Sequence, residues 1–226
     1  MKNMKRNVEL FAEKLNYKSV LILGGTGLFA KELIPKLINY IDNNDIKTNI
    51  FITSRYINKA IEFIPELNRV YIRLIKIDFL NEDDLPVDIN PDYIIHMATT
   101  SATETFNNFS QISKFKVLKN SSEAISKLIS RGEVKRLLFV SSGIAYGKSE
   151  KYEENETCNI DHFDDKNYLA LGKIYSKFYL NSICEKNNTD FKVARCFSFI
   201  SKYMPVDLHY AIGNFVRDAV LNKDIL

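Results

Sequence analysis

The chain has 226 residues, 46% of them hydrophobic and 26% charged, with a formal net charge of +3. This composition suits a globular protein with one α/β domain and a good core, or with one domain and part of a second. Basic and acidic residues are interspersed, so the charge gives no support for binding to nucleic acid. No apolar run approaches the roughly 20 residues that span a bilayer, and the start lacks the apolar stretch of a signal peptide, so no membrane partner is expected.

The chain has 3 cysteines and 3 histidines. The cysteines are widely spaced and odd in number, and the histidines form no metal-ligand spacing with them. We therefore expect reduced thiols, a cytoplasmic location and no metal site.

Residues 2–15 predict a short amphipathic helix with Val8, Leu10, Phe11 and Leu15 on its apolar side. We expect residues 1–17 to form a helical extension that packs on the domain. A helix that binds a partner is the alternative.

Residues 18–31 predict a buried strand, a tight glycine turn and a helix. Apolar residues are followed by the spacing Gly24-x-x-Gly27-x-x-Ala30, and an amphipathic pattern starts at Leu28. Such a turn lets backbone N–H groups and the positive end of a helix approach a pyrophosphate, which a Cβ at the crowded positions would block. The pattern predicts dinucleotide binding, with a purely structural strand-to-helix turn as the alternative.

Residues 49–53 predict a second strand, which ends in Ser54-Arg55. In dinucleotide folds the residue after this strand meets the adenosine ribose, where an acid suits NAD and an arginine suits NADP. Because no acid is nearby in the sequence, Arg55 slightly favours NADP over NAD. A solvated arginine at a strand end is the alternative.

Two further strands are predicted over residues 71–77 and 92–99. The first ends in Asp78-Phe79, whose carboxylate could accept a hydrogen bond from an adenine amino group or could cap the next turn. The second ends in small residues that would let a cofactor lie close. His96 in this strand is expected to be a core histidine rather than a base.

A helix near residues 112–131 and a fifth strand over residues 136–140 follow, and the strand runs into the polar stretch 141–147. Near-continuous apolar strands alternating with helices predict a Rossmann-like, doubly wound parallel sheet with helices on both faces. Ligands of such α/β sheets bind at the carboxyl ends of the strands, where all of these polar motifs fall. We expect residues 18–200 to form this NAD(P)-binding domain.

Taken together, these motifs resemble the extended short-chain dehydrogenase/reductase family, in its nucleotide-sugar epimerase/dehydratase branch. The matching pieces are Gly24-Gly25-Thr26-Gly27-Leu28-Phe29-Ala30, Asp78-Phe79, His96-Met97-Ala98, Ser141-Ser142-Gly143-Ile144-Ala145-Tyr146-Gly147 and Arg195-Cys196-Phe197. They follow the family's order over residues 19–217. The later stretch 208–217 resembles a subgroup that modifies activated sugars for surface polysaccharides.

The resemblance implies a nicotinamide cofactor, NADP or NAD, and a nucleotide-activated sugar as substrate. The implied cofactor contacts are Gly24, Gly27, Leu28, Phe29, Arg55, Asp78, Phe79, Met97, Ala98, Thr99 and Lys173. In many relatives the helices matching residues 112–131 and 168–187 pair two copies into a homodimer. Here their apolar residues could serve that role or could face the sheet.

The resemblance also implies a catalytic serine, tyrosine and lysine, of which Ser142 matches the first and Lys173 the last. In the family, Tyr-x-x-x-Lys places both side chains on one helix face, so that the ammonium lowers the pKa of the phenol and anchors the nicotinamide ribose. Here Leu169 stands at the tyrosine position, and Tyr168 is turned about 140° from Lys173 around a helix. Either the backbone at Tyr168 is non-helical and turns the hydroxyl back to the site, or the protein has lost the acid/base.

Residues 201–226 are expected to be only the beginning of a C-terminal substrate segment, because relatives continue with a further sheet-bearing segment. The leading hypothesis is an NAD(P)-dependent nucleotide-sugar epimerase, dehydratase or reductase in surface polysaccharide biosynthesis. A catalytically silent dinucleotide-binding module, acting as a sensor or partner subunit, is the second. An RNA-binding relative is the third, and the charge balance does not support it.

Overall fold

The computed structural model describes residues 2–81, 84–100, 104, 110–150, 152–155, 158–204 and 211–224, with backbone alone for residues 2–5. The strands are β1 (Lys18–Leu23), β2 (Thr48–Ser54), β3 (Ile72–Lys76), β4 (Tyr93–His96), β5 (Arg136–Ser142) and β6 (Asp190–Cys196). The helices are α1 (Lys2–Glu13), α2 (Leu28–Asn43), α3 (Ile57–Phe63), α5 (Gln111–Ile129), α6 (Tyr168–Lys186) and α7 (Ala211–Val220). Short 3-10 helices include η2 (Phe79–Asn81), η3 (Gly143–Tyr146) and η4 (Asp165–Asn167).

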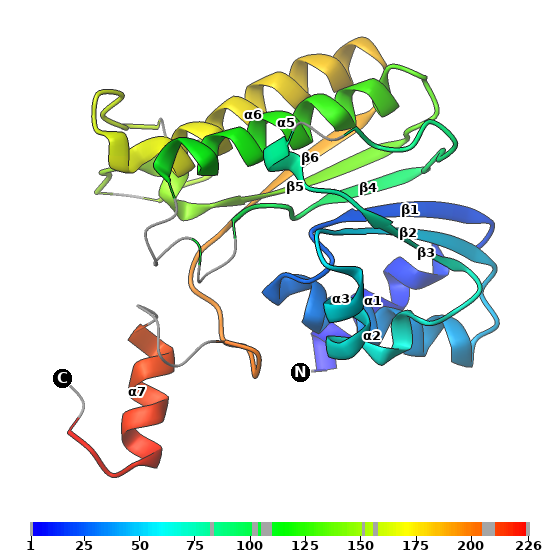
Figure 1. The fold of residues 1–226 in the computed structure, drawn as a ribbon, viewed down its shortest axis with the longest axis horizontal. Helices are drawn as coiled ribbons and strands as arrows, with labels where there is room; N and C mark the ends of the chain where they lie inside the picture. The colour runs from blue at the N-terminus through cyan, green and yellow to red at the C-terminus, as the bar shows by residue number, and fades with distance from the viewer. Residues whose placement is uncertain are drawn as a thin grey trace.

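The strands form a parallel sheet in the order β3-β2-β1-β4-β5-β6. The chain winds outward from β1 to β3, crosses back to the other side of β1 and winds outward again to β6. Helices α1, α2 and α3 cover one face of the sheet, and α5 and α6 cover the other (Figure 1). This is the doubly wound Rossmann-like arrangement that the alternating strands and helices predict. The order reverses between β1 and β4, so the carboxyl ends of these two strands flank the switch point.

The central strand β1 contributes to two hydrophobic cores, one on each face of the sheet. Leu21 and Leu23 belong to the core under α5 and α6, whereas Val20 and Ile22 belong to the core under α1 and α2. Side chains of a strand alternate between the two faces, so a strand covered on both faces must be apolar throughout. This explains the continuous apolar run before the glycine turn.

Helix α1 packs on α2, as its amphipathic pattern suggests. Leu15, just after the helix, is fully buried, and Phe11 packs against the same core. Leu10, in contrast, is 47% exposed, so its assignment to the apolar side was wrong. Phe11 and Leu15 are four residues apart and share a face, whereas Leu10 lies about 100° away from Phe11 around the helix.

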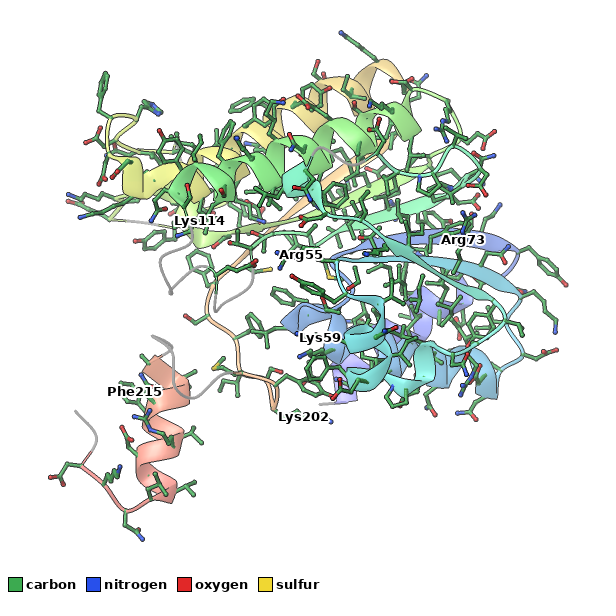
Figure 2. All side chains as sticks on the ribbon, in the orientation of Figure 1. Arg55, Lys59, Arg73, Lys114, Lys202 and Phe215 are labelled. Carbon is green, nitrogen blue, oxygen red and sulfur yellow. The ribbon has the colours of Figure 1, made fainter. Side chains whose placement is uncertain are left out.

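Helix α7 stands away from the sheet, and the side chain of Phe215 on it is partly exposed (Figures 1 and 2). The chain reaches it from β6 past the N-terminal end of α2. There, the rings of Phe29 and Phe199 stack with their centroids 4.3 Å apart. The hydroxyl of Ser201 donates to the carboxylate of Glu32 at 3.0 Å. Within the described parts of the chain, no helix is both long enough and apolar enough to cross a membrane.

Candidate active site

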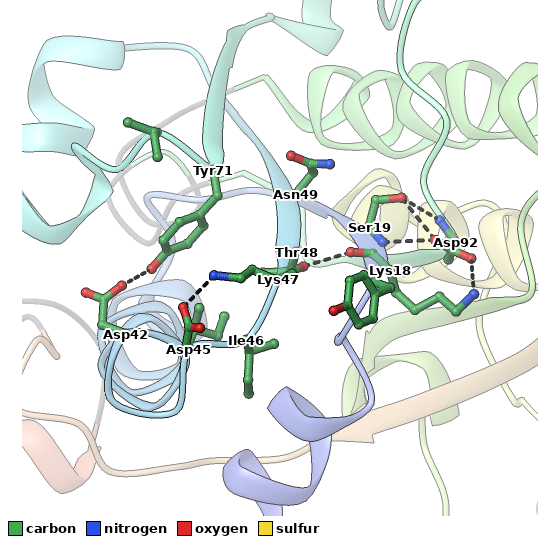
Figure 3. A pocket seen from close by; sticks show the side chains of 13 residues that line it. Lys18, Ser19, Asp42, Asp45, Ile46, Lys47, Thr48, Asn49, Tyr71 and Asp92 are labelled. Carbon is green, nitrogen blue, oxygen red and sulfur yellow. Dashed lines mark hydrogen bonds and ion pairs between the residues drawn. The ribbon is translucent and has the colours of Figure 1, made fainter.

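The two edges of the sheet differ in how their polar groups are used. At the amino ends of β1 and β2 lies an open hollow of about 780 Å³, lined by charged and aromatic side chains (Figure 3). Those side chains pair with one another: Tyr71 donates to Asp42 at 2.5 Å, and Lys47 donates to Asp45 at 2.5 Å. Ligands of open α/β sheets bind at the carboxyl ends of the strands instead. The sequence motifs gather at that opposite edge, so the candidate site lies there.

Gly24 brings the ends of β1 and β4 close together. Its φ is +86°, in the left-handed region that favours glycine. A Cβ at this position would lie 2.9 Å from the backbone nitrogen of Ala98 and 2.9 Å from the carbonyl carbon of Met97. Only a residue without a Cβ allows the turn to pass this close to the exit of β4. At the switch point of the sheet, the backbone of the glycine turn therefore packs directly against the backbone that follows β4.

Gly27 leaves the N-terminus of α2 open. It is the N-cap residue, with φ at −70° and ψ at 167°, and no side-chain hydrogen bond caps the helix there. The nearest atom to a Cβ built at this position is the carbonyl oxygen of Gly24, at 3.3 Å. The first N–H groups of a helix carry partial positive charge and need acceptors. An uncapped helix end beside a glycine turn fits the pyrophosphate of a dinucleotide.

Arg55, directly after β2, lies at the same edge of the sheet (Figure 2). Its Nη1 and Nη2 donate to the two carboxylate oxygens of Glu104, at 2.5 and 2.9 Å. This hydrogen-bonded pair raises the pKa of the Arg55 guanidinium, and the charge of Asp78 adds to the rise. No acid is near Arg55 in the sequence, but Glu104 contacts it in the structure. The chain brings the acid from 49 residues further on, which a local reading of the sequence cannot detect.

Asp78 and Phe79 follow β3 and turn partly away from the edge. Oδ1 of Asp78 accepts from the backbone N–H of Leu80 at 3.0 Å, so the capping alternative is observed. The side chain of Phe79 is 5% exposed and belongs to the core under α5. Its carbonyl oxygen accepts from the amide of Asn120 at 2.6 Å.

The residues after β4 lie against the glycine turn. The N–H of Met97 donates to the carbonyl oxygen of Leu23 at 3.0 Å, Ala98 is buried and Thr99 is exposed. His96 is fully buried, and its Nε2 lies 3.2 Å from Oγ of Ser121. Burial lowers the pKa of His96 to about 3. His96 is therefore a neutral core histidine, as the sequence predicts.

Ser142 and Lys173 both lie near the carboxyl end of β5. Nζ of Lys173 donates to the carbonyl oxygen of Val140 at 2.8 Å and lies 5.0 Å from the centroid of the Phe139 ring. Oγ of Ser142, two residues further along the strand, accepts from the backbone N–H of Ile144 at 3.3 Å. Burial lowers the pKa of Lys173 to about 8. The structure thus holds an ammonium group beside the strand end that carries the expected catalytic serine.

Tyr168 does not have the non-helical backbone that would turn its hydroxyl back toward this lysine. It is the first residue of α6, with φ at −56° and ψ at −33°, both helical values. Its side chain therefore leaves the helix about 140° away from that of Lys173. Leu169, which stands at the tyrosine position of the family, packs against the hydrophobic core under α5 and α6.

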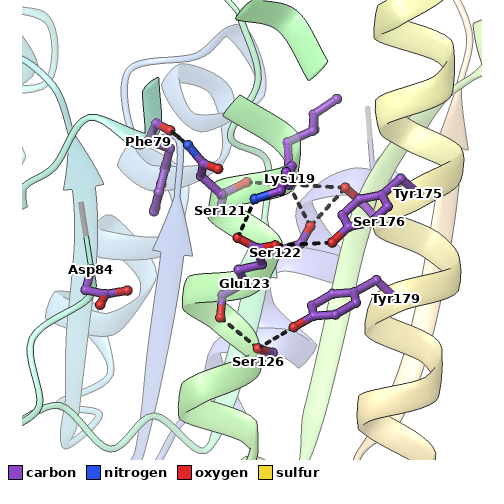
Figure 4. Close-up of polar contacts among 12 residues, drawn as sticks. Phe79, Asp84, Lys119, Ser121, Ser122, Glu123, Ser126, Tyr175, Ser176 and Tyr179 are labelled. Atoms are coloured by element: carbon purple, nitrogen blue, oxygen red, sulfur yellow. Dashed lines mark hydrogen bonds and ion pairs between the residues drawn. The ribbon is translucent and has the colours of Figure 1, made fainter. Parts of the chain in front are cut away.

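A polar seam between α5 and α6 holds the helix that carries Lys173 (Figure 4). Oγ of Ser122 donates to Oγ of Ser176 at 2.9 Å, and the Ser126 hydroxyl lies 3.1 Å from that of Tyr179. Sequence reasoning missed this seam. Its signal is the break in the apolar pattern at Asn120-Ser121-Ser122, where small hydroxyl side chains allow two helices to approach closely.

Residues 20–226 match a model of the NAD dependent epimerase/dehydratase family. The chain belongs to this family. This confirms the resemblance drawn from the motifs. No curated protein sequence shows significant similarity to this family member.

Solved structures of nucleotide-sugar enzymes share the fold. The UDP-N-acetylglucosamine 4-epimerase of Methanobrevibacter ruminantium is 19% identical with a TM-score of 0.69, over 92% of this chain and 64% of that protein. The dTDP-glucose 4,6-dehydratase of Bacillus anthracis, solved with NAD, is 13% identical with a TM-score of 0.66, over 92% and 63%. The UDP-glucuronic acid 4-epimerase of Bacillus cereus, also solved with NAD, is 13% identical with a TM-score of 0.66, over 92% of this chain and 65% of that protein. This epimerase/dehydratase chain thus spans less than two thirds of the length of these neighbours.

Proposed function

We propose that this chain is the NAD-binding part of a nucleotide-sugar epimerase or dehydratase. The observation that carries the proposal is the uncapped N-terminus of α2 beside the Gly24 turn. It offers partly charged N–H groups at the switch point of the sheet, where an anionic dinucleotide is best stabilised. The NAD complexes of the Bacillus anthracis and Bacillus cereus neighbours support this assignment.

The chemistry of such an enzyme begins with oxidation of a sugar hydroxyl, for which bound NAD supplies the hydride acceptor. Ser142 would hold the sugar oxygen through its hydroxyl. Tyr168, the tyrosine next to the family's position, would have to take the proton from it although its helical backbone turns it away from Lys173. Lys173 would contribute positive charge, since at neutral pH most of a group with a pKa of about 8 is protonated.

A catalytically silent dinucleotide-binding module is the second candidate. It is favoured by the helical backbone of Tyr168 and by the packing of Leu169 in the core. Both leave Lys173 without a phenol on its own helix face. Such a module would bind the cofactor and would act as a sensor or as a partner subunit.

We extend the proposal to substrate, assembly and location. Neighbours solved with UDP-sugars favour a nucleotide-activated sugar as substrate. The 65% exposed Phe178 on α6 favours a homodimer formed through α5 and α6. A role in surface polysaccharide biosynthesis rests on the stretch 208–217, of which residues 208–210 lie outside the described residues. The three free cysteines favour the cytoplasm.

The experiment is calorimetric titration of the purified chain with NAD⁺, comparing wild type with Gly27→Val. Gly27 has an ordinary φ, and a Cβ there meets only the Gly24 oxygen, at a tight 3.3 Å, so we expect a variant that folds with a somewhat lower melting temperature. Its side chain would nevertheless occupy space beside the helix terminus. We expect saturable binding to wild type and a loss of at least about tenfold in the affinity of the variant. Absence of binding to folded wild-type protein would refute the proposal.

A further inference from the structure

The Arg55–Glu104 ion pair lies where the adenosine ribose of a dinucleotide meets this fold. Arg55 follows β2, the strand next to β1, and the residue at this position faces the ribose in dinucleotide-binding sheets. Glu104 comes from the connection between β4 and α5. Two segments far apart in the sequence therefore place opposite charges at one end of the candidate site.

The pair has the geometry of a strong ion pair. Each terminal nitrogen of Arg55 donates to a different carboxylate oxygen of Glu104, and this two-point contact is the arrangement in which a guanidinium would otherwise bind a phosphate. The two side chains are 31% and 22% exposed, so solvent screens the pair less than it screens a surface pair. Arg55 is thus already engaged by an internal anion.

The charges around Arg55 disfavour a second anion. The 2′-phosphate of NADP, like other phosphate monoesters, carries nearly two negative charges at neutral pH. To reach the guanidinium it would have to displace the Glu104 carboxylate and would then lie beside it. Asp78, whose charge also raises the pKa of Arg55, adds repulsion. Repulsion between these like charges weakens the binding of NADP, whereas the uncharged 2′-hydroxyl of NAD meets no such repulsion.

We infer that Glu104 is a specificity-determining residue that selects NAD over NADP by occupying Arg55. It supplies from a distant segment the acid that the end of β2 lacks, and its carboxylate can accept a hydrogen bond from a ribose hydroxyl. This inference rests on the proposed function and reverses the preference for NADP that Ser54-Arg55 suggests in the sequence.

The test is calorimetric titration of the full chain with NAD⁺ and with NADP⁺, comparing wild type, Glu104→Gln and Asp88→Asn. Glutamine keeps the size of Glu104 and removes its charge. Asp88 is the matched control, because it also pairs with an arginine through two contacts, at 2.7 and 3.2 Å, but with Arg73 near the start of β3 (Figure 2). We expect wild type to bind NAD⁺ at least about tenfold more tightly than NADP⁺. We expect Glu104→Gln to shift that ratio toward NADP⁺ by about tenfold or more, and Asp88→Asn to leave it unchanged.

The outcomes separate the inference from the proposed function. Wild-type preference for NADP⁺ overturns the inference without any variant, so a failure of Glu104→Gln to fold does not remove the test. If Glu104→Gln binds NAD⁺ but changes the ratio of the affinities for NAD⁺ and NADP⁺ by less than twofold, the inference is also overturned. The proposed function then still stands. If folded wild type binds neither dinucleotide, the proposed function fails and the inference fails with it.

Discussion

The two halves of the carboxyl edge are built by different means. In the half formed by β1, α2 and β4, the features that fit a dinucleotide are backbone features: a positive φ at Gly24 and an uncapped helix end at Gly27. In the half formed by β5 and α6, the chemistry depends on side chains in a fixed helical register. There Lys173 is in place, but the phenol expected four residues before it is Leu169.

The difference shows which kind of site tolerates a change of sequence. A site made of backbone needs only the absence of side chains at a few positions, and many sequences satisfy that condition. A site made of side chains on a helix fails when one residue is replaced or displaced, because each step moves a side chain by about 100°. The half built of backbone therefore keeps the form that suits a dinucleotide, while the half built of side chains lacks the tyrosine that the family resemblance implies.

The largest effect is expected at the backbone-built half. Gly24→Ala should lower the free energy of unfolding by about 3 kcal/mol, because the methyl group meets backbone atoms of Met97 and Ala98 that cannot move aside and the positive φ adds its own cost. Gly132→Ala is the matched control. Its φ is +81°, and nothing lies within 4 Å of its Cβ. Urea unfolding should show that the control lowers the free energy of unfolding by about 1 kcal/mol. Equal losses at the two glycines would contradict the close approach at Gly24.

The catalytic half should show a dependence on pH that originates in Lys173. Burial lowers its pKa from 10.5 to about 8, so between these values the unfolded chain binds a proton that the native chain does not. The free energy of unfolding therefore rises with pH across this window, by up to about 3 kcal/mol. Below pH 8 Lys173 is protonated in the native chain as well, so burial of its charge lowers the free energy of unfolding by the full amount. The free energy of unfolding of wild type and of Lys173→Met is measured at several pH values. It should rise with pH in wild type and not in the variant, and parallel curves would contradict an origin in Lys173.

Restoring the phenol should narrow the difference between the two halves. We expect Leu169→Tyr to raise turnover of a nucleotide sugar about a hundredfold over wild type, equivalent to about 2.7 kcal/mol, because a tyrosine there shares a helix face with Lys173. Turnover is measured as conversion of the nucleotide sugar with saturating NAD⁺, because an epimerase or dehydratase returns the hydride to the sugar and accumulates no reduced nicotinamide. The companion variant is Tyr168→Phe, which removes the other candidate acid/base. If Tyr168→Phe abolishes wild-type turnover and Leu169→Tyr adds nothing, Tyr168 is the acid/base despite its helical backbone.

The smallest effect concerns the polar seam between α5 and α6, the helix that carries Lys173. Ser122→Ala removes the hydrogen bond to Ser176 between α5 and α6 and should cost about 1 kcal/mol in the free energy of unfolding. The exposed Ser182 on α6 is the control, and Ser182→Ala should change stability by less than about 0.5 kcal/mol. Thermal melting of both variants measures the difference. Indistinguishable melting temperatures would show that the seam adds no stability.

The architecture of the protein could be predicted from the sequence. Apolar runs such as residues 20–23 predict strands buried on both faces, and Gly24 with Gly27 predicts the turn into α2, because both signals depend only on near neighbours in the chain. His96 could likewise be predicted to be a core residue from the apolar strand around it. These local patterns also sufficed to indicate the family.

The contacts between side chains of distant segments could be seen only in three dimensions. Arg55 and Glu104 are 49 residues apart, and Ser122 and Ser176 are 54 residues apart, so no local pattern links them. The helical backbone of Tyr168 also became visible only in three dimensions, because the end of a helix is set by what packs around it. Contacts between distant segments depend on how the sheet and helices pack as a whole, which one-dimensional periodicity does not encode.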